Sequence, residues 1–194
     1  MRRPAIFLDR DGVIVEDVDA VLRPDQLILT PGAAEAVKRA IASGRAVVVV
    51  TNQPVVARGL VDEDGVRAVH DALDAMLRAQ GARVDAFYFC PHHPRATIER
   101  YRVACECRKP RPGLLTRAAS ELELELGASV MVGDRLSDVT AGARAGCKTV
   151  LVTSGKHLDA PIESPDPSDA TPDFVAADIT AAMDWALGLI GGQA

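Results

Sequence analysis

The sequence predicts an α/β fold, a three-layer sandwich in which a central parallel sheet is covered by helices on both faces. Short β-branched runs alternate with longer helical patterns along the chain, as in parallel sheets. Val47 to Val50 is a continuous apolar run, which a strand buried on both faces needs. Polar side chains follow several of the runs, where ligands bind in open parallel sheets.

Five strands are expected from the apolar runs. They are Ala5 to Asp9, Ala46 to Thr51, Ala86 to Cys90, Ser129 to Val132 and Thr149 to Val152. Helical patterns separate most of these strands along the chain. We therefore expect crossover connections and parallel strands.

The first helix has readable ends, with Thr30 as the cap, Pro31 at the first helical position and Gly44 after the last turn. Five helices are predicted, at about Ala33 to Ser43, Asp62 to Gln80, Gly113 to Glu123, Ser137 to Ala145 and Ile179 to Leu189. The segment from Ser154 to Pro172 is rich in Pro, Asp and Ser and is predicted to be a surface loop.

Length and composition indicate one ordinary globular domain over residues 1–194. The chain is 48% hydrophobic and carries a formal net charge of -5, which argues against general nucleic-acid binding. It contains no apolar run long enough to cross a bilayer, and the first residues lack the apolar region of a signal peptide. We expect a cytoplasmic monomer that binds neither membranes nor nucleic acid.

Acidic and hydroxyl side chains follow three of the predicted strands. Asp9 and Asp11 lie two residues apart where the first strand ends, so alternation directs both to one side and Arg10 elsewhere. Thr51 follows the second strand and Asp134 the fourth. We therefore expect Asp9, Thr51 and Asp134 to meet at one edge of the sheet.

This set of groups suits Mg²⁺ and phosphoryl transfer. Magnesium favours oxygen ligands, and Asp9, Asp134 and the main-chain carbonyl of Asp11 supply them. Phosphoryl transfer needs alignment and neutralisation of the phosphoryl oxygens, which Thr51 and Lys109 can provide. Taken singly, each motif has another interpretation: the aspartate pair as turn residues, Thr51 as a helix cap, and Asp138 as a cap or a brace for Asp134.

The motifs together resemble those of the haloacid dehalogenase superfamily over nearly the whole chain. DRDGV is similar to its first motif, TNQ to its second, CRKPRPG to its third and GDRLSD to its fourth. The resemblance implies a Rossmann-like fold with a minimal cap and a Mg²⁺-dependent phosphatase. It makes Asp9 the nucleophile and Asp11 the general acid and base, with Thr51 and Lys109 holding the phosphoryl group.

Three of the four cysteines and two histidines lie in one segment, residues 90–107. Cys90-Pro-His92-His93 and Cys105-Glu-Cys107 supply four ligands for a structural zinc site, and the spacing alone does not choose between the two histidines. Unpaired thiols and polar loop histidines are the alternative. The pattern resembles the zinc loop shared by heptose bisphosphate phosphatases and histidinol phosphatases, which implies that the histidine at position 92 binds.

The resemblance to heptose bisphosphate phosphatases implies a small phosphorylated sugar as the substrate, and cationic side chains near the motifs agree with it in part. Arginines lie within or beside the motifs of an acidic protein, as a substrate with a second phosphate requires, although two of them are equally well explained as surface charges. The residues expected to bind substrate are Asn52, Gln53, Arg58, Arg108 and Arg135. The two arginines that are equally well explained as surface charges are Arg58 and Arg111. Two hypotheses compete with a phosphatase that acts on a sugar bisphosphate: a histidinol-phosphate phosphatase, and an inactive, zinc-stabilised binding protein.

Overall fold

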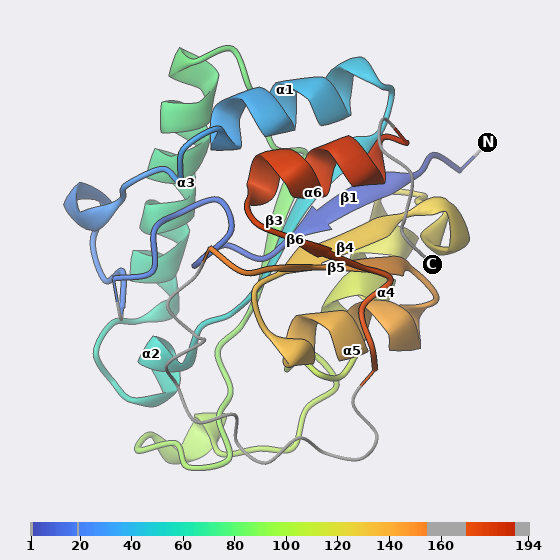
Figure 1. Cartoon of the computed structure of the whole chain (residues 1–194). Helices are drawn as coiled ribbons and strands as arrows, with labels where there is room; N and C mark the ends of the chain where they lie inside the picture. The colour runs from blue at the N-terminus through green and yellow to red at the C-terminus, as the bar shows by residue number, and fades with distance from the viewer. Residues whose placement is uncertain (1, 19, 155–169, 189–194) are drawn as a thin grey trace.

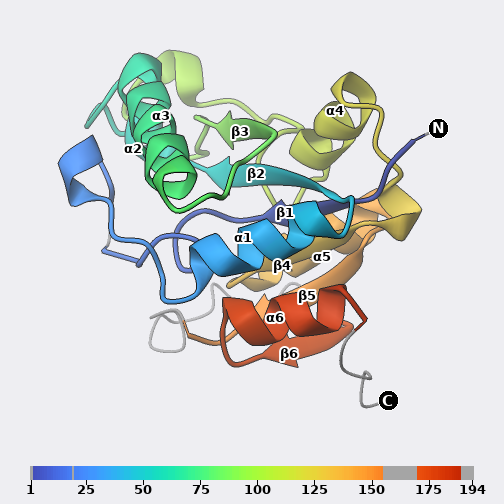
Figure 2. The same ribbon diagram turned by 90° about the horizontal axis from the view of Figure 1, so that it is seen from above.

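The computed structural model describes residues 2–18, 20–154 and 170–188, which form one layered α/β unit (Figures 1 and 2). Its sheet has six strands in the order β3-β2-β1-β4-β5-β6, and all neighbours pair in parallel. The strands are β1 Ala5–Leu8, β2 Ala46–Asn52, β3 Ala86–Cys90, β4 Val130–Gly133, β5 Lys148–Val152 and β6 Phe174–Ala176. The predicted three-layer fold is confirmed.

The longer helices are α1 Ala33–Ala42, α3 Glu63–Ala79, α4 Gly113–Glu121, α5 Leu136–Ala145 and α6 Ile179–Ala186. The short ones are α2 Pro54–Ala57 and the 3-10 helices η1 Pro24–Gln26, η2 Glu99–Tyr101 and η3 Leu126–Ala128. All five predicted helices are present, and their ends differ from the predicted ones by at most two residues, except that α6 ends at Ala186, three residues before the predicted end. The last residue of the final predicted helix, and most of the predicted Ser154 to Pro172 loop, lie outside the described residues.

The predicted cap of the first helix was wrong. Gly32, at a φ of 82°, is the residue before the helix, and no side chain caps it. Because this left-handed backbone suits glycine and breaks the helical path, Pro31 lies in a turn that precedes α1. Two short elements were also missed, α2 and the edge strand β6, since neither is long enough to show a periodic pattern.

Alternation along the strands divides the core into two layers. Ile6 and Leu8 face a cluster that includes residues of α1, α3 and α6, whereas Ala5 and Phe7 face one built with α4 and α5. Figure 1 shows α1 and α6 together on one side of the sheet and α4 and α5 on the other. With both faces covered, the open places for chemistry are the ends of the strands.

Candidate active site and metal centres

The carboxyl ends of β1 and β4 bring Asp9 and Asp134 together. The Asp9 N–H donates to the Val132 carbonyl at 2.9 Å, which continues the sheet pairing by one residue beyond β1. Gly12, at a φ of 80°, then turns the chain back so that its N–H reaches the Val15 carbonyl at 2.7 Å. The sequence DRDG therefore places its first aspartate in the sheet and its second in the turn.

Three buried carboxylates form a cluster at this edge. Oxygen atoms of Asp9, Asp134 and Asp138 lie within 4.8 Å of one another, and all three residues are buried. Like charges at this distance inside a protein repel strongly unless a cation lies among them. The donors are all oxygen, so the cluster suits Mg²⁺. We call this set the carboxylate cluster.

Asp138 belongs to this cluster although the sequence motifs left its role open. Its Oδ2 accepts from the Arg135 N–H at 3.0 Å, and it therefore caps α5. The close approach depends on Gly133, because a Cβ there would lie 2.1 Å from the Asp138 Cβ. Burial raises the pKa of the Asp138 carboxyl to about 7, against the attraction of Lys109.

Lys109 supplies one positive charge to the carboxylate cluster. Its Nζ lies 2.9 Å from Asp9 Oδ1, 2.6 Å from Asp138 Oδ1 and 2.9 Å from the Val50 carbonyl oxygen. The contact with the Val50 carbonyl is a hydrogen bond, and the contacts with the two aspartates are ion pairs. Burial alone would lower the pKa of Lys109, but the two carboxylates raise it above its ordinary value, so the side chain stays charged.

Asn52 holds the backbone of Lys109 in place. Its Nδ2 donates to the Lys109 carbonyl and its Oδ1 accepts from the Lys109 N–H, both at 3.1 Å. This amide pair joins the end of β2 to the loop that carries the lysine. The predicted contact of Asn52 with substrate stays a prediction, since both ends of its amide already bind the protein.

The carboxylate of Asp11 is held separately from the carboxylate cluster. Arg10 donates from Nε to Oδ1 at 2.9 Å and from Nη2 to Oδ2 at 2.8 Å, and Gln53 donates to Oδ2 at 2.8 Å. Gln53 also donates to Thr51 Oγ1 at 3.0 Å. The expectation that Arg10 points elsewhere was wrong, because its long side chain folds back from the interior to its neighbour.

The cysteine segment closes into a second cluster of potential metal ligands. Cys90, His92, Cys105 and Cys107 converge, and all cysteines are free thiols. The sulfur atoms lie 3.1 to 3.6 Å apart and His92 Nδ1 is 3.3 Å from Cys107 Sγ. Tetrahedral zinc with Zn–S bonds of about 2.3 Å places sulfurs roughly 3.8 Å apart, so a small expansion would accommodate it.

The structure separates the two histidines that the spacing left open. His93 Nδ1 accepts from the Arg95 N–H at 3.0 Å, and His93 lies outside the sulfur cluster. Within the cluster, a hydrogen bond with Cys90 lowers the pKa of Cys107 to about 5, which favours the thiolate that metals bind. The fourth cysteine, Cys147, is buried elsewhere, and burial raises its pKa to about 12.

Comparisons with known proteins agree with this geometry. A sequence profile described as HAD-hydrolase-like matches residues 106–182. D-glycero-β-D-manno-heptose-1,7-bisphosphate 7-phosphatase of Photorhabdus laumondii is 43% identical over 162 residues, covering 82% of this chain and 86% of the relative. This chain belongs to the heptose-bisphosphate phosphatase family of haloacid-dehalogenase-like hydrolases. The protein of the same description from Rhodopseudomonas palustris is 46% identical over 145 residues, 75% of this chain and 81% of its own.

Solved structures of this family share the fold. D,D-heptose 1,7-bisphosphate phosphatase from B. bronchiseptica, complexed with magnesium and phosphate, matches with a TM-score of 0.80 and 35% identity, over 96% of this chain and 99% of its own. A putative HAD-like phosphatase from Mesorhizobium loti matches with a TM-score of 0.81 and 33% identity, over 96% and 85%. The resemblance deduced from the four motifs is confirmed at the level of the family.

A basic pocket of about 450 Å³ adjoins the loop between the two clusters. Four of its lining residues are arginines, Arg102, Arg108, Arg111 and Arg144, and each donates to a main-chain carbonyl oxygen at 2.7 to 3.2 Å. Lys109 lines it as well. Arg58 and Arg135, also predicted to bind substrate, do not line this pocket; both are exposed, and Arg135 Nε lies 4.0 Å from Asp134 Oδ1.

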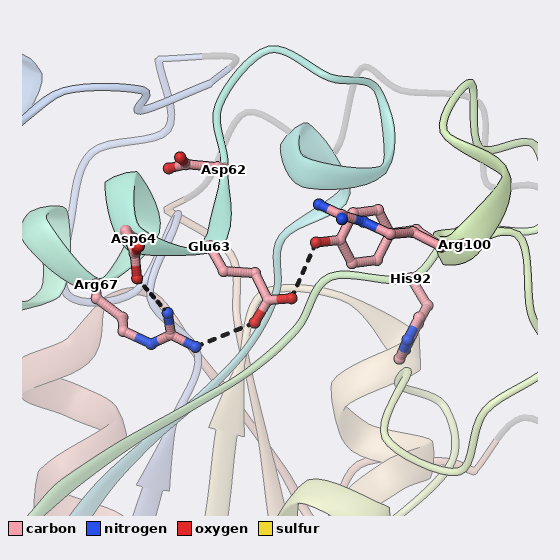
Figure 3. A pocket seen from close by; sticks show the side chains of 7 residues that line it. Asp62, Glu63, Asp64, Arg67, His92 and Arg100 are labelled. Carbon is pink, nitrogen blue, oxygen red and sulfur yellow. Dashed lines mark hydrogen bonds and ion pairs between the residues drawn. The ribbon is translucent and has the colours of Figure 1, made fainter.

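A second pocket, of about 530 Å³, lies between the start of α3 and the cysteine segment (Figure 3). Glu63 lies at its centre, where one oxygen accepts from the Tyr101 hydroxyl at 3.0 Å and the other lies 3.1 Å from Arg67. Arg67 also contacts Asp64 at 2.6 Å. These contacts connect α3 with η2, so most polar groups of this pocket are bound to one another.

Proposed function

We propose that this protein removes the C7 phosphate from D-glycero-D-manno-heptose 1,7-bisphosphate through a covalent aspartyl-phosphate on Asp9. The observation that supports it is the convergence of Asp9, Lys109 and Asp134 at the sheet edge, beside an aspartate held on a separate set of donors. The relatives described above carry the name of this activity. The geometry of the site supports the reaction class, and the relatives support the substrate.

In the first step, a carboxylate oxygen of Asp9 forms a bond to phosphorus while the bond from phosphorus to the sugar oxygen breaks. Asp11 gives a proton to that departing oxygen. Lys109 neutralises charge beside Asp9, and Thr51 lies at the end of the adjacent strand to hold a phosphoryl oxygen. The lysine is already in place before substrate arrives, so it needs no reorganisation during the step.

In the second step, Asp11 takes a proton from water as the water oxygen attacks phosphorus. The bond between phosphorus and Asp9 then breaks, which releases inorganic phosphate and restores the Asp9 carboxylate. Asp11 ends each cycle protonated and ready for the next leaving group. Its separate anchoring on Arg10 and Gln53 suits this alternation, because it is not among the carboxylates that share one cation.

Asp9, Asp134 and the main-chain carbonyl of Asp11 are the proposed ligands of Mg²⁺, with Asp138 close to them. A bound Mg²⁺ would neutralise the carboxylates and the phosphoryl oxygens. We propose structural Zn²⁺ for Cys90, His92, Cys105 and Cys107, whose sulfur and nitrogen atoms suit that softer ion. The free thiols in that cluster support a reducing, cytoplasmic setting.

The basic pocket is the proposed site of the phosphate that remains on the sugar. Arg108 and Lys109 are adjacent in sequence, yet Lys109 turns into the carboxylate cluster while Arg108 donates to the His92 carbonyl at 3.1 Å. The pocket thus offers guanidinium groups next to the reacting centre, as a bisphosphate requires. Roles for Asn52, Gln53, Arg58 and Arg135 in substrate binding stay predictions.

The test is a comparison of specificity constants. Purified protein with Mg²⁺ is given the heptose 1,7-bisphosphate, the heptose 1-phosphate, histidinol phosphate and a panel of sugar monophosphates, and released phosphate is measured. We expect the highest kcat/KM for the bisphosphate and one phosphate released per molecule. A higher value for histidinol phosphate would contradict the substrate, and no release from any compound would favour an inactive binding protein.

A further inference from the structure

A buried chain of contacts leads from α3 to the carboxylate of Asp11. Arg10 is 1% exposed and is among the largest fully buried side chains of the described residues. Its Nε and Nη2 bind both oxygens of Asp11, and its Nη1 lies 3.5 Å from His70 Nε2. A guanidinium in the interior requires partners for its donors, and Asp11 and His70 supply them.

His70 is fixed in place by aromatic neighbours. Its ring stacks on Phe87 at 5.0 Å and meets the edge of Phe89 at 5.7 Å. Arg67, one turn earlier on α3, lies over the Phe89 ring, with its guanidinium carbon 5.9 Å from the ring centre. Figure 3 shows Arg67 bound to Glu63 and Asp64. Burial and the charge of Arg10 lower the pKa of His70 to about 3, so the ring is neutral and Nε2 can accept a hydrogen bond.

The two oxygens of Asp11 have different numbers of partners. Among the residues that the structure describes, Oδ2 accepts from Arg10 and Gln53, whereas Oδ1 accepts from Arg10 alone. A carboxylate oxygen has two lone pairs, so Oδ2 is saturated and Oδ1 retains one. Side-on pairing with a guanidinium also fixes the plane of the carboxylate. The contacts thus fix which oxygen can exchange a proton with a substrate or water.

We propose that Arg10 and His70 are positioning residues for acid–base catalysis: His70 holds Arg10, and Arg10 holds Asp11 so that Oδ1 carries the proton. The proposal rests on the proposed phosphatase function and goes beyond it, because neither residue contacts the reacting atoms. Asp11 lies in the turn after β1, and its side chain is 30% exposed. Without the buried guanidinium, the Gln53 contact at Oδ2 would remain, and the carboxylate could turn about it.

The experiment uses two substitutions at His70 in the full-length protein with Mg²⁺. His70→Phe keeps a ring against Phe87 and removes the acceptor, whereas His70→Gln keeps an acceptor at a similar reach. We expect kcat for the sugar bisphosphate to fall about tenfold in His70→Phe, the scale of one lost hydrogen bond to a charged group, with KM unchanged. His70→Gln should recover most of that loss.

A second substrate distinguishes a loss of Asp11 positioning from a general loosening of the core. The para-nitrophenolate leaving group departs without a proton, so with para-nitrophenyl phosphate Asp11 is needed only in the second step. In rapid mixing, His70→Phe should release close to one nitrophenol per chain in a fast burst and then turn over slowly. Leu73→Val, one turn along α3 in the core, is the control that weakens packing and leaves His70 unchanged, and it should show no such change of rate-limiting step.

The possible outcomes distinguish failure of the proposed phosphatase function from failure of the positioning roles of Arg10 and His70. An inactive wild-type protein would overturn the proposed phosphatase function itself. With an active wild-type protein, an unchanged kcat in His70→Phe, equal loss of both steps without a burst, or no recovery in His70→Gln would overturn the positioning roles alone. A burst in His70→Phe together with recovery in His70→Gln would establish them.

Discussion

The carboxylate cluster and the sulfur cluster differ in what holds them together. Asp9 and Asp134 are placed by neighbouring parallel strands, and Lys109 already neutralises part of their charge. The four potential zinc ligands lie mostly in a long connection whose regular structure is the three-residue η2. A sheet edge can keep its geometry without a metal, whereas a loop of this kind depends on one. The predictions for Asp9, Lys109 and Cys107 test this contrast.

The largest effect is expected from removal of the nucleophile. Asp9→Asn should lower kcat at least about 10,000-fold, because no covalent intermediate can form. The folded state should be retained, since the amide has the same shape and one of three clustered negative charges is lost. Phosphate release and thermal unfolding are the measurements, with the exposed Asp25→Asn as the control. Substantial turnover by Asp9→Asn would contradict the mechanism.

Removal of the buried cation should affect stability as well as activity. Lys109→Met leaves the carboxylates of Asp9 and Asp138 without their ammonium partner, a change that costs about 3 to 5 kcal/mol for a buried pair. Denaturant unfolding in EDTA measures it. Lys148→Met, which removes an exposed pair with Asp173, should leave stability nearly unchanged.

A double substitution sharpens this result. Lys109→Met combined with Asp138→Asn removes one positive and one negative charge together, so part of the lost stability should return while activity stays low. If the double variant were no more stable than Lys109→Met, the buried ion pair would not be the cause of the loss.

The sulfur cluster should respond to loss of one ligand by losing metal. Cys107→Ser should reduce bound zinc to well below one per chain and loosen the segment that precedes Arg108 and Lys109, with a fall in activity smaller than that of Asp9→Asn. Cys147→Ser is the matched control because Cys147 lies outside the cluster. Zinc content and activity are the measurements, and full zinc content in Cys107→Ser would remove this cluster from the proposal.

The smallest effect is acid destabilisation through His70. Its folded-state pKa is lowered to about 3, below the usual histidine value of 6.5, so near pH 5 the unfolded chain binds a proton that the folded chain does not. The stability it contributes is complete above pH 6.5 and declines as the pH falls toward 3, by about 2 kcal/mol between pH 7 and pH 5. Denaturant unfolding of wild type and His70→Gln at both pH values should show this difference; parallel curves would refute it.

The strand ends were predictable because chemistry and hydrophobic pattern coincide there. Val47 to Val50 marks a buried strand, Thr51 follows it, and the same pattern holds for Phe7 and Leu8 before Asp9. These features are local, so the sequence shows them. The helix cap at Thr30 failed for the opposite reason: the left-handed Gly32 set the start of α1 in place of the polar residue before it.

Contacts between distant segments could not be read from the pattern. The pairing of Asn52 with the Lys109 backbone and the contact of Arg10 with His70 join residues whose order in the chain gives no sign of them. Alternation even predicted the wrong direction for Arg10, since a side chain this long can bend around its own backbone.

By itself, the sequence determined the parallel sheet, the strand ends that carry the acidic and hydroxyl groups, and the family, because each depends on short stretches of consecutive residues. Only the tertiary structure decided the partners of those groups: which histidine joins the cysteines, which aspartates share Lys109, and which arginine holds Asp11. Long side chains choose among several neighbours by burial and charge, and those neighbours exist only once the chain has folded.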